Sequence, residues 1–207
     1  MYRILIGLLV IFPFATPVRA GCTEDIQAML SAGEKWENYR IETRTLMGGA
    51  TVQHTQQWFR DYSHFHQAVR ETGVHWLVLG TEEYTSRDGK TWQPSRMRNE
   101  NWLEETLARN ATLRETIRDA SCDTETVDGV ALVRFSHTQE TMEPVRSVSQ
   151  VTTLLDPATM RPVQRHMKTT TPAQTVQQGD ARAEIMESRI EMIVDYFWDE
   201  PITLPTP

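Results

Sequence analysis

From Trp36 onward, polar and apolar side chains alternate along most of the chain, and this period of two constrains the fold more than any other feature. Successive side chains of a strand point to opposite faces, so the pattern indicates strands with one buried and one exposed face. The first run covers 39–47 and ends at Gly48-Gly49, and similar runs follow at 52–60, 63–71, 74–79 and 82–87. The sequence therefore predicts an antiparallel meander.

Two Asp-Gly dipeptides indicate hairpin turns, because these residues tolerate the positive φ angles of a tight turn. Asp88-Gly89 lies in "SRDGKTW", and a second Asp-Gly lies in "TVDGVALVRFSH". Further strands are predicted at 145–155 and 162–171, with a turn at Asp156-Pro157 between them. The segment "VHWLVL" at 74–79 is apolar on both faces, which predicts a central strand covered on both sides.

Two segments have helical spacing instead. Residues 24–35 place Ile26, Met29 and Leu30 on one side, with acidic residues near the start, which predicts a short amphipathic helix. Residues 99–119 predict one helix with a break after Asn110, or two short helices. The segment 182–199 suits either a helix or a strand, and periodicity alone leaves the choice open.

Residues 1–20 have the layout of a secretory signal peptide. Arg3 precedes an apolar run from Ile4 to Phe14, and Val18-Arg19-Ala20 offers small residues at the cleavage positions, so cleavage is expected after Ala20. The apolar run is shorter than the roughly 20 residues of a spanning helix, and no stable membrane insertion is expected. The sequence thus predicts a secreted, periplasmic protein whose residues 21–207 form a single domain.

The only two cysteines of the chain are Cys22 and Cys122. In an oxidising compartment an even number of cysteines favours pairing, which predicts a structural disulfide. The alternative is a lipid anchor at Cys22, since bacterial lipoprotein signals also place a cysteine just after the cleavage site. Arg19 occupies the position that is usually aliphatic in such signals, and acylation would leave Cys122 without a partner.

The formal net charge is -7, and removal of the leader with Arg3 and Arg19 makes it -9. A chain with this negative charge is repelled by nucleic acid and by an anionic membrane surface, so neither is expected as a partner.

No sequence motif indicates catalysis or a cofactor. His64 and His66 would share a strand face, with His75 near them across a hairpin, and such a group could hold a metal. No HExxH, CxxC, Gly-x-Ser-x-Gly or phosphate-binding glycine loop is present, so a polar outer strand face is the favoured interpretation. We expect no catalytic, cofactor-binding or metal-binding residue.

Three segments, in this order, resemble those of one family: "YTSRDGKTWQ", "TLLDPATMRPVQRHM" and "DYFWDEPITLP". With the order of the expected helices and strands, they resemble the periplasmic lipoprotein-carrier superfamily with the LolA/LolB-like fold, over most of residues 24 to 205. The resemblance implies an α+β fold, in which a strongly curved antiparallel sheet forms an incomplete half-barrel capped by short helices. It also favours a strand for 182–199, and it transfers no individual functional residue.

The function that the resemblance implies is non-enzymatic. The half-barrel cavity would hold an apolar ligand, either a lipid or the acyl chain of a lipoprotein. The candidate lining residues are large and apolar or aromatic: Trp36, Trp58, Trp76, Leu77, Leu79, Tyr84 and Trp92. The alternative is a cell-envelope protein-interaction module, which fills its cavity with these side chains and binds a protein partner on an outer face or edge.

Overall fold

A computed structural model of the chain describes residues 21–142, 145–178 and 181–207. The expected signal peptide and its cleavage site after Ala20 lie outside the described residues. The helices are α1 (Cys22–Gly33) and α2 (Trp102–Glu115). The strands are β1 (Tyr39–Met47), β2 (Ala50–Asp61), β3 (His64–Val69), β4 (Val74–Leu79), β5 (Glu82–Ser86), β6 (Gln93–Met97), β7 (Arg118–Val127), β8 (Val130–Thr141), β9 (Ser147–Leu155), β10 (Pro162–Thr171), β11 (Gln174–Gln178), β12 (Ala181–Ile185) and β13 (Ser188–Trp198).

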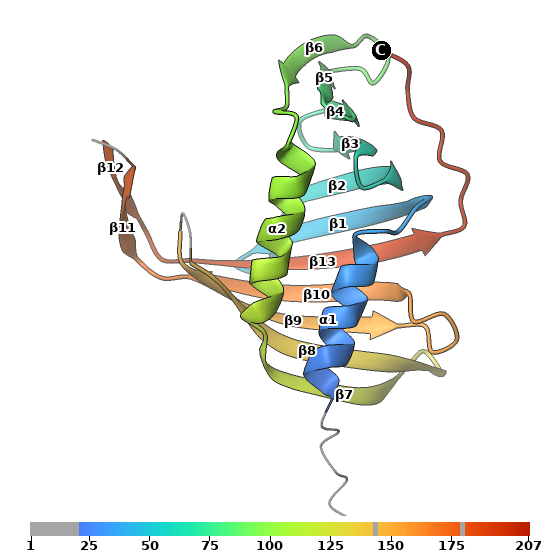
Figure 1. The fold of residues 1–207 in the computed structure, drawn as a ribbon, viewed down its shortest axis with the longest axis vertical. Helices are drawn as coiled ribbons and strands as arrows, with labels where there is room; N and C mark the ends of the chain where they lie inside the picture. The colour runs from blue at the N-terminus through green and yellow to red at the C-terminus, as the bar shows by residue number, and fades with distance from the viewer. Residues whose placement is uncertain (1–20, 143–144, 179–180) are drawn as a thin grey trace, which may run out of the picture.

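One large antiparallel sheet dominates the structure. Its 11 strands follow the order β6-β5-β4-β3-β2-β1-β13-β10-β9-β8-β7, so β6 and β7 are edges and the sheet is not closed. The last strand, β13, pairs with both β1 and β10 and so joins the two meanders. The remaining two strands, β11 and β12, form a separate hairpin that projects from one end of the sheet (Figure 1).

Both helices lie across the same face of the curved sheet (Figure 1). The helix α1 turns Ile26 and Met29 towards the sheet, where they join Phe135 and Leu155 in the main buried cluster. The expected α+β fold, an open curved sheet capped by short helices, is confirmed. Neither helix among the described residues has the length and apolar character needed to cross a membrane.

A disulfide joins Cys22, the first residue of α1, to Cys122 on β7. Their Cα atoms are 5.8 Å apart, and the bridge closes a loop with a sequence separation of 100. Both residues belong to or pack against the buried cluster under α1. The predicted pairing is therefore confirmed, and it fixes the start of α1 to the edge strand of the sheet.

Several local expectations are settled by the structure. The expected break after Asn110 is wrong: 102–115 form one uninterrupted helix, in which the Asn110 side chain bonds to Tyr62 and leaves the helical backbone intact. Most of 182–199 is strand, as the resemblance favoured. The strand β4 lies third from the edge instead of centrally, although Leu77 and Val78, on opposite faces of it, are both fully buried.

The hairpin at Asp88-Gly89 is present. Its loop is longer than a two-residue turn, since the strand pair that closes it is Thr85 with Gln93. The carboxylate of Asp88 accepts hydrogen bonds from the backbone N–H groups of Lys90 and Thr91, at 2.9 and 2.7 Å. These bonds hold the pKa of Asp88 well below its usual value. The second Asp-Gly turn has the expected form, with positive φ at Asp128 and Gly129.

Candidate functional site

The strand pairing assigns each side chain to one face of the sheet, because residues directly opposite one another share a face. One row on the face under the helices consists of Tyr196, Ile41, Gln57, Gln67 and Trp76. The neighbouring row on the opposite face consists of Phe197, Arg40, Trp58, His66, Leu77 and Tyr84. We call the first face concave and the second convex.

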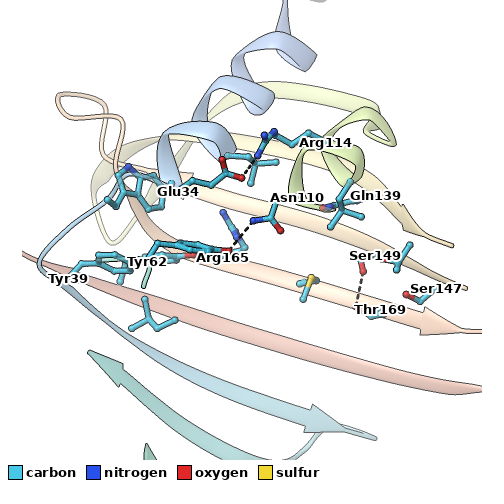
Figure 2. Close-up of a pocket in the computed structure, with 18 residues that line it drawn as sticks. Glu34, Tyr39, Tyr62, Asn110, Arg114, Gln139, Ser147, Ser149, Arg165 and Thr169 are labelled. Atoms are coloured by element: carbon cyan, nitrogen blue, oxygen red, sulfur yellow. Dashed lines mark hydrogen bonds and ion pairs between the residues drawn. The ribbon is translucent and has the colours of Figure 1, made fainter. Parts of the chain in front are cut away.

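A cavity of about 550 Å³ lies between the concave face and the two helices. The end of α1 and the segment after it contribute Leu30, Gly33, Glu34 and Trp36, while α2 contributes Asn110, Leu113 and Arg114. The sheet contributes residues from β1, β8, β9, β10 and β13, and Tyr62 follows β2 (Figure 2). A cavity of this size falls within the range of about 300–1,000 Å³ that is typical of small-molecule sites.

The walls of this cavity are chemically mixed. The apolar and aromatic wall residues are Leu30, Trp36, Tyr39, Ile41, Tyr62, Leu113, Met167 and Tyr196. Apart from Asn110 on α2, the polar, uncharged ones cluster on β8, β9 and β10: Gln139, Thr141, Ser147, Ser149 and Thr169. A ligand with an apolar body and a polar end therefore fits these walls better than a purely apolar one.

Polar contacts hold the helices over the cavity. Arg114 of α2 forms an ion pair with Glu34, just after α1, and its carbonyl oxygen accepts a 3.0 Å hydrogen bond from Gln27 Nε2. Asn110 Nδ2 donates to the hydroxyl of Tyr62 at 3.0 Å, which ties α2 to the sheet (Figure 2). These contacts border the cavity, and they leave its volume unfilled.

An aromatic cluster closes one end of the cavity. Trp36 contacts the rings of Tyr39, Tyr196 and Trp198 edge-on, with centroid distances of 5.2 to 6.4 Å. Burial raises the pKa of Tyr39, so its hydroxyl stays neutral. A second hollow, of about 750 Å³, lies on the other side of α1, and Trp36 lines both. The indole is thus part of the wall between them.

Of the seven candidate lining residues, Trp36 lies in the wall of this cavity. Trp76 is on the concave face, but it lines a separate hollow near β5 and β6, with Val74 and Thr85. By the strand register, the other five belong to the convex side: Trp58, Leu77, Leu79 and Tyr84 on the strands, and Trp92, which packs over His66 there. Neighbours such as Trp76 and Leu77 point to opposite faces, so one cavity cannot be lined by both.

The histidines that suggested a metal have separate partners. His66 Nε2 lies 3.0 Å from His75 Nδ1, while Trp58 stacks on His66 and Trp92 meets both imidazoles edge-on. His64 Nδ1 instead lies 2.9 Å from a carboxylate oxygen of Asp61. Across the described part of the chain, no group of three or more His, Cys, Asp or Glu side chains could hold a metal ion.

This packing predicts acid sensitivity. Burial and the neighbouring His75 lower the pKa of His66 to about 4, whereas in the unfolded chain it is about 6.5. Between these values the unfolded state binds a proton that the folded state does not, so stability falls as the pH drops from 6.5 towards 4. We expect a loss of about 2 kcal/mol from this residue after allowance for its partial exposure.

The measurement is urea unfolding at a series of pH values for the wild type, His66→Gln and His64→Gln. The wild type and His64→Gln should lose stability more steeply than His66→Gln between pH 6.5 and 4. Titrating groups that contact neither His64 nor His66 contribute equally to all three proteins and cancel in the comparison, whereas Asp61, which contacts His64, does not. Parallel curves for the wild type and His66→Gln would contradict the prediction.

Three polar residues that line the cavity were not among the candidates predicted from the sequence: Tyr62, Asn110 and Arg165. In "PVQRHMKTTT" the alternation of Arg165, Met167 and Thr169 was visible, but it gave no indication of which face they occupy. The face follows only from the pairing of β10 with β9 and β13.

No protein-family model matches the chain, and no curated protein matches it. Among solved structures, it is similar to a Vibrio parahaemolyticus domain described as an outer membrane lipoprotein-sorting protein. That likeness has 13% sequence identity and a TM-score of 0.33, and covers 87% of this chain and 93% of the other. A LolA superfamily protein from Nitrosomonas europaea has 11% identity and a TM-score of 0.32, with 86% and 94% covered. At such TM-scores these likenesses carry no functional inference for this chain.

Proposed function

We propose that this chain is a non-enzymatic periplasmic binding protein that carries an apolar ligand, a lipid or the acyl chain of a lipoprotein, in the cavity under its helices. The observation that carries the proposal is the cavity of about 550 Å³ between the concave sheet face and the helices. Its apolar walls come from both layers, with Trp36 and Leu113 on the helical side and Ile41 and Met167 on the sheet.

The physical basis is the coverage of the concave face. A half-barrel has an inward face that must be covered, and two helices cross this one without filling the space beneath them (Figure 1). An acyl chain in that space would gain about 0.8 kcal/mol per buried CH₂ group, so a chain of moderate length could bind with useful affinity.

The periplasmic part of the proposal is supported by the disulfide and by the expected leader. Cys22 pairs with Cys122, and such bridges persist in oxidising compartments. With its sulfur in this bridge, Cys22 cannot also carry a thioether-linked lipid anchor. A protein freed from its leader and bridged in this way would diffuse in the periplasm and exchange its ligand there.

A cell-envelope protein-interaction module is the second candidate, and exposed methionines favour it. Met142 and Met186 have 62% and 83% of their surface exposed, and flexible thioethers of this kind are common at adaptable protein interfaces. The self-filling expected for this candidate is not what the structure has, since a volume of about 550 Å³ stays open; the candidate then requires that this space binds no lipid and that the exposed methionines contact a partner. The two candidates therefore differ in whether purified protein binds an apolar molecule.

Mass spectrometry separates them. Protein purified from the periplasm is measured under native conditions, then denatured with and without reductant. The expected result is a non-covalent adduct of lipid mass that is lost on denaturation, and a gain of about two mass units on reduction of the one bridge. Bare protein that also fails to bind a neutral apolar dye saturably would refute the carrier function and favour the interaction module.

A further inference from the structure

Arg165 on β10 is a cation in the cavity wall that lacks an acidic partner among the described residues (Figure 2). Its Nε donates to Thr153 Oγ1 at 3.3 Å, and one terminal nitrogen lies 3.9 Å from Met29 Sδ. Its guanidinium also lies 6.0 Å from the centroid of the Tyr196 ring. All these partners are neutral, although a half-buried charge is normally paired with an opposite one.

The other charged groups of the cavity neutralise each other. Arg114 forms its ion pair with Glu34, and both line the same cavity as Arg165. The remaining lining side chains are uncharged, so the cavity has a net charge of about +1 from Arg165. This positive site lies within a chain whose formal net charge is -7. The positive charge is therefore local to the cavity and does not reflect the net charge of the chain.

Nearby titratable groups do not supply the missing negative charge. His137 is only 4% exposed, and an imidazole is either neutral or positive. Burial lowers the pKa of His137, as does the charge of Arg165, so the imidazole stays neutral. Tyr39, whose pKa is raised, is neutral as well. The compensating anion must therefore come from outside the described residues.

We propose that Arg165 binds the anionic head group of a single-chain amphiphile, a carboxylate or a phosphate monoester, whose acyl chain lies in the same cavity. This inference rests on the proposed function and specifies its ligand class. The planar guanidinium matches carboxylate and phosphate oxygens in a bidentate arrangement. The tail would extend from Arg165 along Ile41 and along Met167, the next residue of β10 on the same face, towards Leu113.

The test is displacement of the neutral dye Nile red by dodecanoate, dodecyl phosphate and dodecanol at constant pH and salt concentration. We expect the two anions to bind about tenfold more tightly than the alcohol, because only they can pair with Arg165. Acetate and inorganic phosphate, which lack the chain, should not displace the dye. Displacement by these small ions as effective as by the amphiphiles would overturn the proposal in favour of a free-anion site.

Substitutions of Arg165 test whether this residue causes the preference for anionic amphiphiles. Arg165→Gln should bind all three amphiphiles with equal affinity, while Arg165→Lys should keep part of the preference for anions. Arg189→Gln is the matched control, since Arg189 is 79% exposed in its side chain and pairs with Glu187 at the surface. It removes the same charge and should behave like the wild type. Thermal unfolding checks that each variant is folded.

The outcomes distinguish this inference from the function on which it rests. If the wild type binds dodecanol as tightly as dodecanoate, the head-group site is refuted and the apolar carrier stands. The head-group site is also refuted if Arg165→Gln and Arg165→Lys both retain the full preference. If folded wild type binds none of the three amphiphiles, the carrier function and the head-group site are refuted together.

Discussion

Replacing both cysteines, Cys22→Ser with Cys122→Ser, should lower the free energy of unfolding by about 4 to 5 kcal/mol. The bridge spans a sequence separation of 100, and the chain-entropy model assigns about this value to a loop of that length. Typical domains have a total stability of about 5 to 15 kcal/mol, so the loss is a large fraction of it. Urea unfolding at constant pH measures the difference directly.

Reductant provides the control. Reduction of the wild type should lower its stability to nearly that of the double variant, and the same reductant should leave the double variant unchanged. A loss below about 1 kcal/mol would contradict the prediction and would mean that the unfolded chain is already compact without the bridge.

The same bridge bears on how a ligand enters. The start of α1 is covalently fixed to β7, and Ile26 and Met29 are buried beneath the helix. In contrast, α2 has no buried side chain, and it is held by a few polar contacts such as Asn110 to Tyr62 and Trp102 Nε1 to the Gly80 carbonyl. We therefore expect α2, and not α1, to move when the cavity opens.

Most strands and turns were predictable because their signals are local, whereas the curved half-barrel was expected only from the resemblance. Alternation of polar and apolar residues identified most strands, and the turn at Asp128-Gly129 has the geometry that its dipeptide favours. The segment 182–199 is different, since Ile193 and Phe197 fit a helix or a strand equally well by periodicity. Its strand form is decided by pairing with β1 and β10, which are distant in the sequence.

The cavity was not predictable for a related reason. Selecting large apolar residues favoured Trp58 and Leu77, yet the register places both on the convex face, while the adjacent Trp76 is concave. Whether the odd-numbered or the even-numbered residues of a strand face the helices depends on the long-range pairing and on where α1 and α2 pack. Arg165 was missed because a charged residue in a strand is normally read as solvent-exposed.

The second large effect is expected from blocking the cavity. Ser149 lies on the concave face of β9, where its hydroxyl is 2.9 Å from that of Thr169, and both line the cavity. Ser149→Trp would place an indole in the space proposed for the ligand. We expect the affinity for an apolar dye or a fatty acid to fall by at least about tenfold. The loss of the hydroxyl contact should cost only about 1 kcal/mol of stability.

The matched control is the next residue along the same strand. Gln150 points to the convex face, because neighbouring strand residues alternate, so Gln150→Trp adds the same side chain outside the cavity. Its ligand affinity should stay within about twofold of the wild type. Both variants are titrated with Nile red after their folding is verified by thermal unfolding. If both bind as the wild type does, the ligand lies elsewhere; if both lose binding, the effect comes from disturbing β9 and not from filling the cavity.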